Sequence, residues 1–427
     1  MEVIKGSDRK EILKRLLSRS KLEIDEINSI VKDILYNTRM KKDKALREYT
    51  EKFDGVLLEN FLVSEEEIEN ALKNINRELK EDLIKAAENI KNYHEKQLRK
   101  SYFLKEDKNI VLGQIISPLE KVGIYVPGGS ASYPSTVLMN ALPAKIAGVN
   151  EITMISPPNK YGKIKDSILV AAFIAGVNKI YKIGGAQGIA ALAFGTETIG
   201  KVDKITGPGN IYVTLAKKQV SGYVGIDMLA GPSEIMIIAD QWANPKYIAA
   251  DLISQAEHDK MAASILVTDY EPIIDKVLLE LELQIPSLDR KDIIKKSLED
   301  YGIIILTESL EESIEIVNEI APEHLEILTE NPFEIYSNIK NAGAIFLGEY
   351  SPEPVGDYFA GTNHTLPTSS TSRFSSSLSV DDFIKKTSLI YYSKEALLES
   401  KDSIIRIAEE EGLRGHANSV KIRFEDV

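Results

Sequence analysis

Apolar residues recur at helical spacing through much of the first hundred residues. The segment SEEEIENALKNINRELKEDLIKAAENIKNYHEKQ opens with Ser64 and Glu67 at the spacing of a capping box. Apolar side chains then return at helical intervals, at Ile68, Ala71, Leu72, Ile75, Leu79, Leu83 and Ala87. The pattern predicts one long amphipathic helix over residues 64–100, and residues 1–22 are also expected to be helical.

Beyond residue 100 the pattern changes to short apolar runs. The runs SYFLK and IVLGQIIS flank the polar turn EDKN and predict a pair of strands. Later runs alternate with helix-length segments: VGIYVP, EITMIS, KIYKIG, VDKIT, EIMIIAD, ASILVTD, GIIILT and AGAIFLG. This alternation predicts a doubly wound α/β fold with parallel sheets. After Ser379 the chain becomes polar and helical again.

The composition excludes several classes of protein. The 427 residues are 43% hydrophobic, and the net charge of −13 disfavours nucleic-acid binding. The longest apolar run, ILVAAFIAGV, is shorter than the roughly 18 residues of a membrane-spanning helix, and the first residues have no signal-peptide character. We therefore expect a cytoplasmic protein without membrane or nucleic-acid partners. The cysteine count of zero excludes disulfides, cysteine-bound zinc and a thiol nucleophile.

Three glycine-rich turns, YVPGGSASYPS, IGGAQGIAALAFG and GPGN, each follow an apolar run and precede a helix-length segment. In α/β proteins such turns direct backbone amides toward a phosphate or dinucleotide. None of them contains the GxGxxG fingerprint, and each alone is compatible with a tight strand-to-helix turn. Together they favour nucleotide binding in a different mode.

Four of the five histidines lie in segments that also carry acids or amides: His258, His324, His364 and His416. A single helical histidine beside a glutamate is commonly a solvated surface pair. Gln255 and His258, however, are three positions apart and would share a helical face, offering an amide oxygen and an imidazole nitrogen to one ion such as zinc. On a helix the adjacent Glu323 and His324 would point about 100° apart, which favours two separate tasks.

Eight motifs in order resemble the histidinol dehydrogenase family: KVGIYVPGGSASYPSTVLMNALPAKIAGV, GGAQGIAALAFGT, KITGPGN, AGPSE, SQAEHD, APEHLE, GDYFAGTNHTLPTSS and EGLRGHANSV. The resemblance extends from about Asn37 to the end of the chain. It implies oxidation of L-histidinol to L-histidine in two NAD-dependent steps through the aldehyde, the last reaction of histidine biosynthesis. It also implies an intertwined homodimer with one zinc ion per active site.

The resemblance implies a role for each matching residue. The zinc ligands would be Gln255, His258, Asp357 and His416. His324 would take the hydroxyl proton and Glu323 would activate water, which replaces the missing thiol in aldehyde oxidation. The substrate contacts would be Ser233, Gln255, His258, His324, Asp357, Glu411 and His416, and the NAD contacts Tyr125, Gln187 and Asn210. For His364 a supporting polar role and a satisfied loop histidine both remain open.

The resemblance also implies two incomplete Rossmann-like domains with small helical end segments. The first would comprise residues 23–121 and 235–377, and the second, residues 122–234, would bind NAD. The helical tail, residues 378–427, would contribute Glu411 and His416 to the partner's site. Lys42 and Ser377 depart from the family pattern, since both stand where glycine is usual.

Two other functions remain open on these residues. A zinc hydrolase would use the same ligand types with a metal-bound water, and it would need neither NAD nor the glycine turns. A noncatalytic nucleotide-binding homologue would keep the fold but is expected to have lost Glu323 or His324, and both are present.

Overall fold

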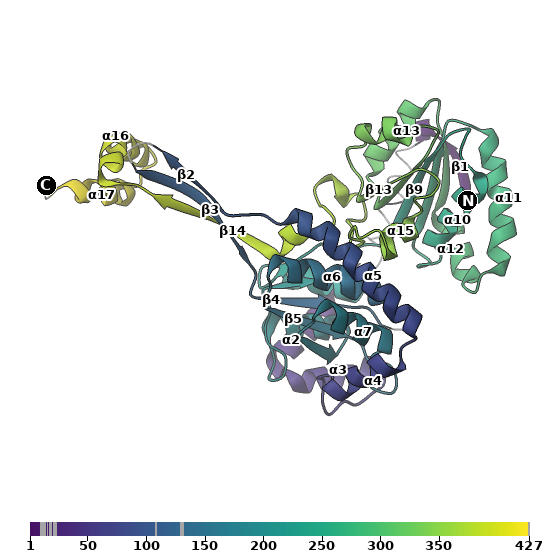
Figure 1. Ribbon diagram of the computed structural model, residues 1–427, viewed down its shortest axis with the longest axis horizontal. Coiled ribbons are helices and arrows are strands. Elements are labelled where there is room, and N and C mark those ends of the chain that lie inside the picture. Colours follow the sequence, from purple (N-terminus) through teal and green to yellow (C-terminus); the bar gives the residue numbers. More distant parts are fainter. Residues whose placement is uncertain are drawn as a thin grey trace. The chain divides into compact units, whose positions relative to one another are not determined.

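A computed structural model describes residues 1–8, 14, 16, 19, 24–106, 109–128 and 132–425. The chain forms two compact units (Figure 1). The first comprises Met1–Gln97 and Leu119–Phe383, and the second Leu98–Pro118 and Ile384–Val427. Within the described residues, no helix has both the length and the apolar character to cross a membrane.

The larger sheet of the first unit is parallel throughout, as the alternating pattern predicts. Its order is β1 (Glu2–Lys5), β11 (Gly302–Leu306), β10 (Ala263–Thr268), β9 (Glu234–Ala239), β12 (His324–Leu328) and β13 (Ala344–Leu347). Successive residues of β9 enter opposite cores, because strand side chains alternate between the faces. One core contains α10 (Pro245–Ala256), α11 (Pro272–Gln284) and α12 (Lys291–Tyr301), and the other α13 (Leu310–Ile320) and α14 (Pro332–Ile335).

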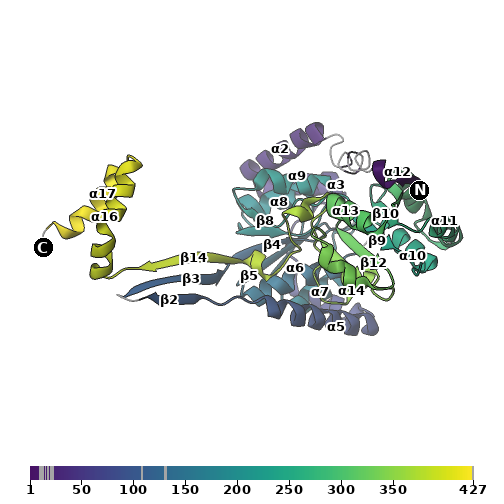
Figure 2. The same cartoon turned by 90° about the horizontal axis from the view of Figure 1, so that it is seen from above.

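The smaller sheet is also parallel. Its order is β6 (Lys179–Lys182), β5 (Glu151–Ser156), β4 (Lys121–Tyr125), β7 (Lys204–Thr206) and β8 (Gly225–Ile226). One face is covered by α4 (Glu65–Asn74), α5 (Arg77–His94), α6 (Pro134–Ala147) and α7 (Asp166–Ala175). The other is covered by α2 (Ile24–Lys41), α3 (Asp43–Asp54), α8 (Gly185–Phe194) and α9 (Ile211–Val220), as Figure 2 shows for α8 and α9.

The amino-terminal third differs from the prediction in three ways. The helix expected over 64–100 is two helices, because Ile75 is extended and Asn76 caps α5 by accepting a bond from the backbone of Leu79. The predicted capping box of Ser64 and Glu67 is confirmed. Helices α2 to α5 pack on the smaller sheet, although residues 23–121 were grouped with 235–377. Of the segment 1–22, expected to be helical, residues 2–5 form an edge strand and most of the rest lies outside the described residues.

The second unit is an antiparallel sheet followed by two helices. The sheet has the order β14 (Ile384–Tyr391), β3 (Ile110–Pro118) and β2 (Tyr102–Glu106), and the helices are α16 (Lys394–Glu410) and α17 (Arg414–Lys421). The predicted strand pair is therefore confirmed. Its hairpin pairs with a strand of the tail, so residues 98–118 group with 384–427 instead of with the first α/β domain.

Candidate functional site

The amino ends of β9 and β12 bring Ser233, Glu323 and His324 together. These strands are neighbours in the larger sheet, and His324 pairs with Ile235. His324 is the first residue of β12, so the helix assumed for Glu323 and His324 is wrong. The run HLEIL is buried throughout and lies between two strands, where a short apolar run is stable in extended form. Glu323 immediately precedes the strand, and the two side chains lie close together, with Oε2 of Glu323 3.8 Å from Nδ1 of His324.

One hydrogen bond defines the tautomer of His324. Its Nδ1 lies 3.0 Å from the carbonyl oxygen of Glu234. A carbonyl only accepts, so Nδ1 carries the proton and Nε2 keeps its lone pair. Nε2 is buried and has no hydrogen-bond partner among the described residues. Burial, together with His258 and His364 nearby, lowers the pKa of His324 to about 4, so the ring is a neutral proton acceptor at pH 7.

Glu323 is a buried carboxyl group with the opposite shift. Its Oε2 accepts a hydrogen bond of 2.8 Å from the backbone N–H of Glu234. Burial raises the pKa of Glu323 well above its ordinary value, and the carboxylates of Glu234, Asp357 and Glu353 raise it further. A carboxylate with a raised pKa is a stronger base, which is suited to activating water near neutral pH.

His258, Glu353 and Asp357 form a second group, the carboxylate–histidine cluster. One potential ligand atom from each lies within 4.8 Å of the others. Glu353 and Asp357 are four positions apart at the two ends of one turn of α15 (Glu353–Tyr358). The sequence prediction missed Glu353, and this i, i+4 spacing from Asp357 was the available signal.

Gln255 lies beside this cluster in the chain. It is in the last turn of α10, whereas His258 follows the helix end, so the two do not share a helical face as expected. A tight turn keeps them close instead, since the N–H of His258 donates to the carbonyl of Gln255 at 3.2 Å. The side-chain amide of Gln255 is buried, and both its polar atoms lack a partner among the described residues. Such an amide is costly unless a ligand binds it.

The charges of the cluster also fit a bound cation. Burial, and then the neighbouring Asp357, raise the pKa of Glu353 to about 8, and burial raises that of Asp357 to about 6. Two buried carboxyl groups cannot both ionise readily without a nearby positive charge. His258, Asp357 and the unpartnered Gln255 therefore match the donor types expected for zinc.

A cavity of about 510 Å³ opens beside the cluster. His258 and Glu353 line it, together with Ser254 and Glu257 from the same region and Ser132 to Ser135 before and within α6. Its size falls within the range of small-molecule sites. His364 lies against Asp357, with Nδ1 3.1 Å from the backbone oxygen of Asp357 and 3.8 Å from its carboxylate.

The proposed NAD residues lie around the carboxyl ends of the smaller sheet. Tyr125 ends β4, Gln187 lies in α8 after β6, and Asn210 caps α9 after β7. Strand order reverses between β4 and β7, and such switch points are where open α/β sheets bind nucleotides. The side-chain oxygen of Gln187 is buried without a partner among the described residues.

The GPGN turn approaches β4 so closely that only glycine fits at its first position. Gly207 has φ +112°, and a Cβ there would lie 2.1 Å from the backbone oxygen of Tyr125. The YVPGG turn passes partly outside the described residues, since residues 129–131 are not among them.

Glu411 and His416 belong to the second unit. Glu411 is the residue that ends α16, His416 lies in α17, and both are exposed there. The first unit therefore brings together the predicted ligands His258 and Asp357, with Gln255 joined to His258 by a backbone hydrogen bond, and the contribution of His416 remains a prediction.

Comparison with known proteins identifies similar chains of nearly the same length. Residues 17–424 match the family model described as histidinol dehydrogenase. Histidinol dehydrogenase of Clostridium acetobutylicum is 57% identical over 98% of this chain and 97% of the relative. That of Caldanaerobacter subterraneus is 58% identical over 97% of this chain and 96% of the relative. The crystal structure of histidinol dehydrogenase from Elizabethkingia anophelis has a TM-score of 0.94 at 40% identity, covering 100% of this chain and 98% of that one.

Proposed function

The chain belongs to the histidinol dehydrogenase family, and from this premise we propose that it oxidises L-histidinol to L-histidine through the aldehyde, in two NAD-dependent steps. One observation carries the proposal. The carboxylate–histidine cluster is close enough to affect both catalytic side chains. Asp357 and Glu353 raise the pKa of Glu323, and His258 lowers the pKa of His324. Acid–base groups and a metal-type donor set thus occupy one site.

We propose that Gln255, His258 and Asp357 hold zinc, with His416 as the fourth ligand. The unpartnered amide of Gln255 and the raised pKa values of the buried carboxyl groups support this set. Zinc, when bound, would supply a Lewis-acid anchor for the imidazole and amine of the substrate. Glu353 would then support Asp357, and Ser233 and Glu411 would contact the substrate.

In the first oxidation, the Nε2 of His324 accepts the hydroxyl proton of the substrate. Its lone pair is available because Nδ1 carries the proton that is donated to Glu234. In the second oxidation, Glu323 takes a proton from the water that adds to the aldehyde. The chain has no cysteine, so the hydrate takes the place of a thiol adduct.

NAD would be held by Tyr125, Gln187 and Asn210. The position of these residues around the switch point of the smaller sheet supports this assignment. NAD, when bound, accepts the hydride in each oxidation.

The test is the stoichiometry of the reaction. With L-histidinol, the purified enzyme is expected to form two NADH for each histidine released, with little free aldehyde in solution. A ratio of one NADH per product would contradict the two-step assignment. A zinc hydrolase would form no NADH at all.

A further inference from the structure

Arg19 is buried beneath the amino ends of the larger sheet, and we propose that it is a positioning residue for Glu323 and His324. It does not touch either side chain. It acts through Glu234, whose carboxylate it binds and whose backbone contacts both. The inference rests on the catalytic roles proposed above for Glu323 and His324.

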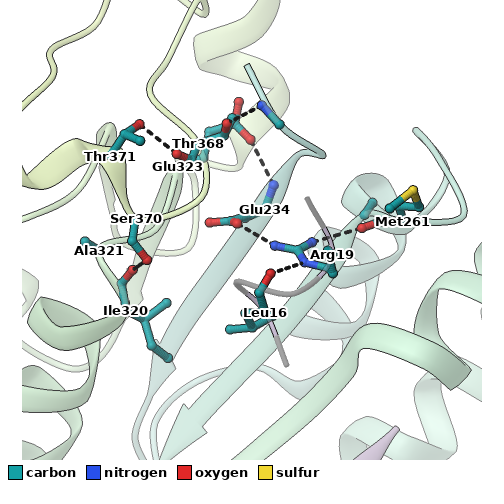
Figure 3. A network of polar contacts seen from close by, with 12 residues as sticks. Leu16, Arg19, Glu234, Met261, Ile320, Ala321, Glu323, Thr368, Ser370 and Thr371 are labelled. Carbon is teal, nitrogen blue, oxygen red and sulfur yellow. Dashed lines mark hydrogen bonds and ion pairs between the residues drawn. The ribbon is translucent and has the colours of Figure 1, made fainter. Parts of the chain in front are cut away.

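The guanidinium of Arg19 is held on several sides (Figure 3). It forms an ion pair with Glu234, in which the two side chains are only 1% and 5% exposed. It also donates to the backbone oxygen of Met261 at 2.9 Å and to that of Leu16 at 3.2 Å. The ring of Tyr301 lies 5.5 Å from the guanidinium carbon. Because the guanidinium is planar and rigid, these partners together fix the orientation of the Arg19 side chain.

The peptide groups of Glu234 connect this ion pair to the catalytic side chains. Its N–H donates to the carboxylate of Glu323 at 2.8 Å, and its carbonyl accepts from the Nδ1 of His324 at 3.0 Å. One residue therefore aims the carboxylate of Glu323 and defines the tautomer of His324. A shift of the Glu234 backbone would therefore weaken both hydrogen bonds and misorient the side chains of Glu323 and His324.

The carboxylate of Glu234 is also bound by the loop that follows α15. The backbone N–H of Ser369 bonds to it. The same loop is bound to the segment before β9 and to the end of α13. Thr368 accepts from the N–H of Gly231 at 2.6 Å, and Ser370 donates to the carbonyl of Ile320 at 2.6 Å. Arg19 supplies the positive charge in this arrangement, because it opposes the rise in the pKa of Glu234 that burial causes.

The loss of Arg19 would leave a buried carboxylate without its cation. Removing one partner of such a pair is far more disruptive than replacing both, because the remaining charge has no compensation. The side chain of Glu234 would then protonate or move toward water. Either change alters the segment that binds Glu323 and His324.

Three variants and a control test the proposal in the NAD- and zinc-loaded enzyme. Arg19→Met removes the charge, Arg19→Met with Glu234→Gln removes both charges, and Arg19→Lys keeps the charge but not the planar fork. Ile316→Ala is the control, because it opens a cavity in the apolar core that covers one face of the larger sheet, and an apolar side chain makes no hydrogen bond or ion pair with Glu234. We expect Arg19→Met to lower kcat for both histidinol and added histidinal about ten- to a hundredfold, with KM for histidinol nearly unchanged.

We expect the double variant to fold and to lose kcat as well, and Arg19→Lys to recover part of it. Ile316→Ala should reduce stability and leave kcat within about twofold. If the double variant keeps wild-type kcat for both substrates, or if Ile316→Ala lowers kcat as much as Arg19→Met, Arg19 only stabilises the fold and the proposal is wrong.

A spectroscopic measurement separates positioning from catalysis. With imidazole-¹⁵N histidine, the signal of His324 is assigned by its absence in His324→Asn, which the small number of histidines makes practical. In the wild type we expect a single Nδ1-protonated tautomer, and in Arg19→Met a mixture of tautomers. An unchanged tautomer in Arg19→Met would overturn the proposal. If His324→Asn instead oxidised histidinol normally, the catalytic assignment would fail, and the spectra would still decide whether Arg19 positions the ring.

Discussion

At the scale of single residues, Glu323 and His324 are neighbours with opposite properties. Burial disfavours the charged form of each, so it makes His324 a neutral base and Glu323 a carboxyl group with a raised pKa. Environments that push the pKa values of two groups in opposite directions commonly indicate separate roles in proton transfer.

The two roles can be separated by substitution. His324→Asn is expected to slow oxidation of histidinol by a factor of about 10² to 10⁴, the usual contribution of a general base. Glu323→Gln is expected to spare that step relative to oxidation of added histidinal, because its task is to activate water. Single-turnover NADH formation from each substrate measures both effects. If Glu323→Gln blocked the alcohol step and left the aldehyde step unharmed, the assigned roles would be reversed.

Gln255 offers a test of the metal site that does not depend on activity. In the metal-free protein its buried amide has no partner among the described residues, which costs about 1 to 3 kcal/mol. Gln255→Leu is therefore expected to raise the Tm of the chelated protein, and to abolish most of the rise that zinc produces in the wild type. Thermal melts with and without zinc measure both changes. A variant that is destabilised when metal-free, yet still stabilised fully by zinc, would exclude Gln255 as a ligand.

At the scale of secondary-structure elements, the junction of α2 and α3 contains a strained residue. Lys42 joins the two helices with φ 51° and ψ −127°. Glycine adopts this conformation freely, whereas a side chain there costs about 1 to 3 kcal/mol. The resemblance led us to expect glycine at this position, so the lysine found there has a structural consequence, namely a strained backbone at Lys42.

Lys42→Gly is accordingly expected to stabilise the protein by about 1 kcal/mol, after the greater entropy of glycine in the unfolded chain is subtracted. The urea midpoint measures the change. The matched control is Lys44→Gly, which replaces an exposed lysine in the first turn of α3 and should instead destabilise the protein, by no more than about 1 kcal/mol. If both substitutions lowered the midpoint equally, Lys42 would not be strained.

At the scale of the whole molecule, the second unit is poorly equipped to be stable alone. Its helices bury only a small apolar cluster, consisting of Ile405, Ala408, Ala417 and Val420. Its sheet exposes large apolar side chains, among them Phe103, Leu104 and Ile390 at 58%, 57% and 72%. Exposed apolar groups of this kind commonly mark an interface. They support the proposal that a second subunit completes the active site with Glu411 and His416.

A shared site predicts complementation between two inactive chains. Asp357→Ala and His416→Ala chains, unfolded together and refolded at random, would form mixed dimers in about half of all cases. In a mixed dimer one site receives both defects and the other receives neither, so activity is expected to return to about a quarter of the wild-type value. NADH formation by the refolded mixture measures it. If mass measurement confirms mixed dimers and the mixture stays inactive, all ligands come from one chain.

The sequence alone determined the features that depend on local chemistry. Periodicity identified most strands of the two parallel sheets, although it missed β1, β8 and β12, and residue spacing identified the capping box at Ser64. These features depend on residues a few positions apart. The glycine turns and the segments around His258 and His324 were recognisable from residue type and spacing. The fold class followed from the same alternation of strands and helices.

Only the tertiary structure decided which distant groups meet. The amphipathic helices α2 to α5 fit either sheet by pattern, and packing assigned them to the smaller one. The short run at His324 was compatible with helix or strand, and it became a strand because two strands pair with it. The ion pair of Arg19 and Glu234 joins residues 215 positions apart. A charge pattern read along the chain cannot reveal such a pair, because burial and partner both arise only when the chain folds.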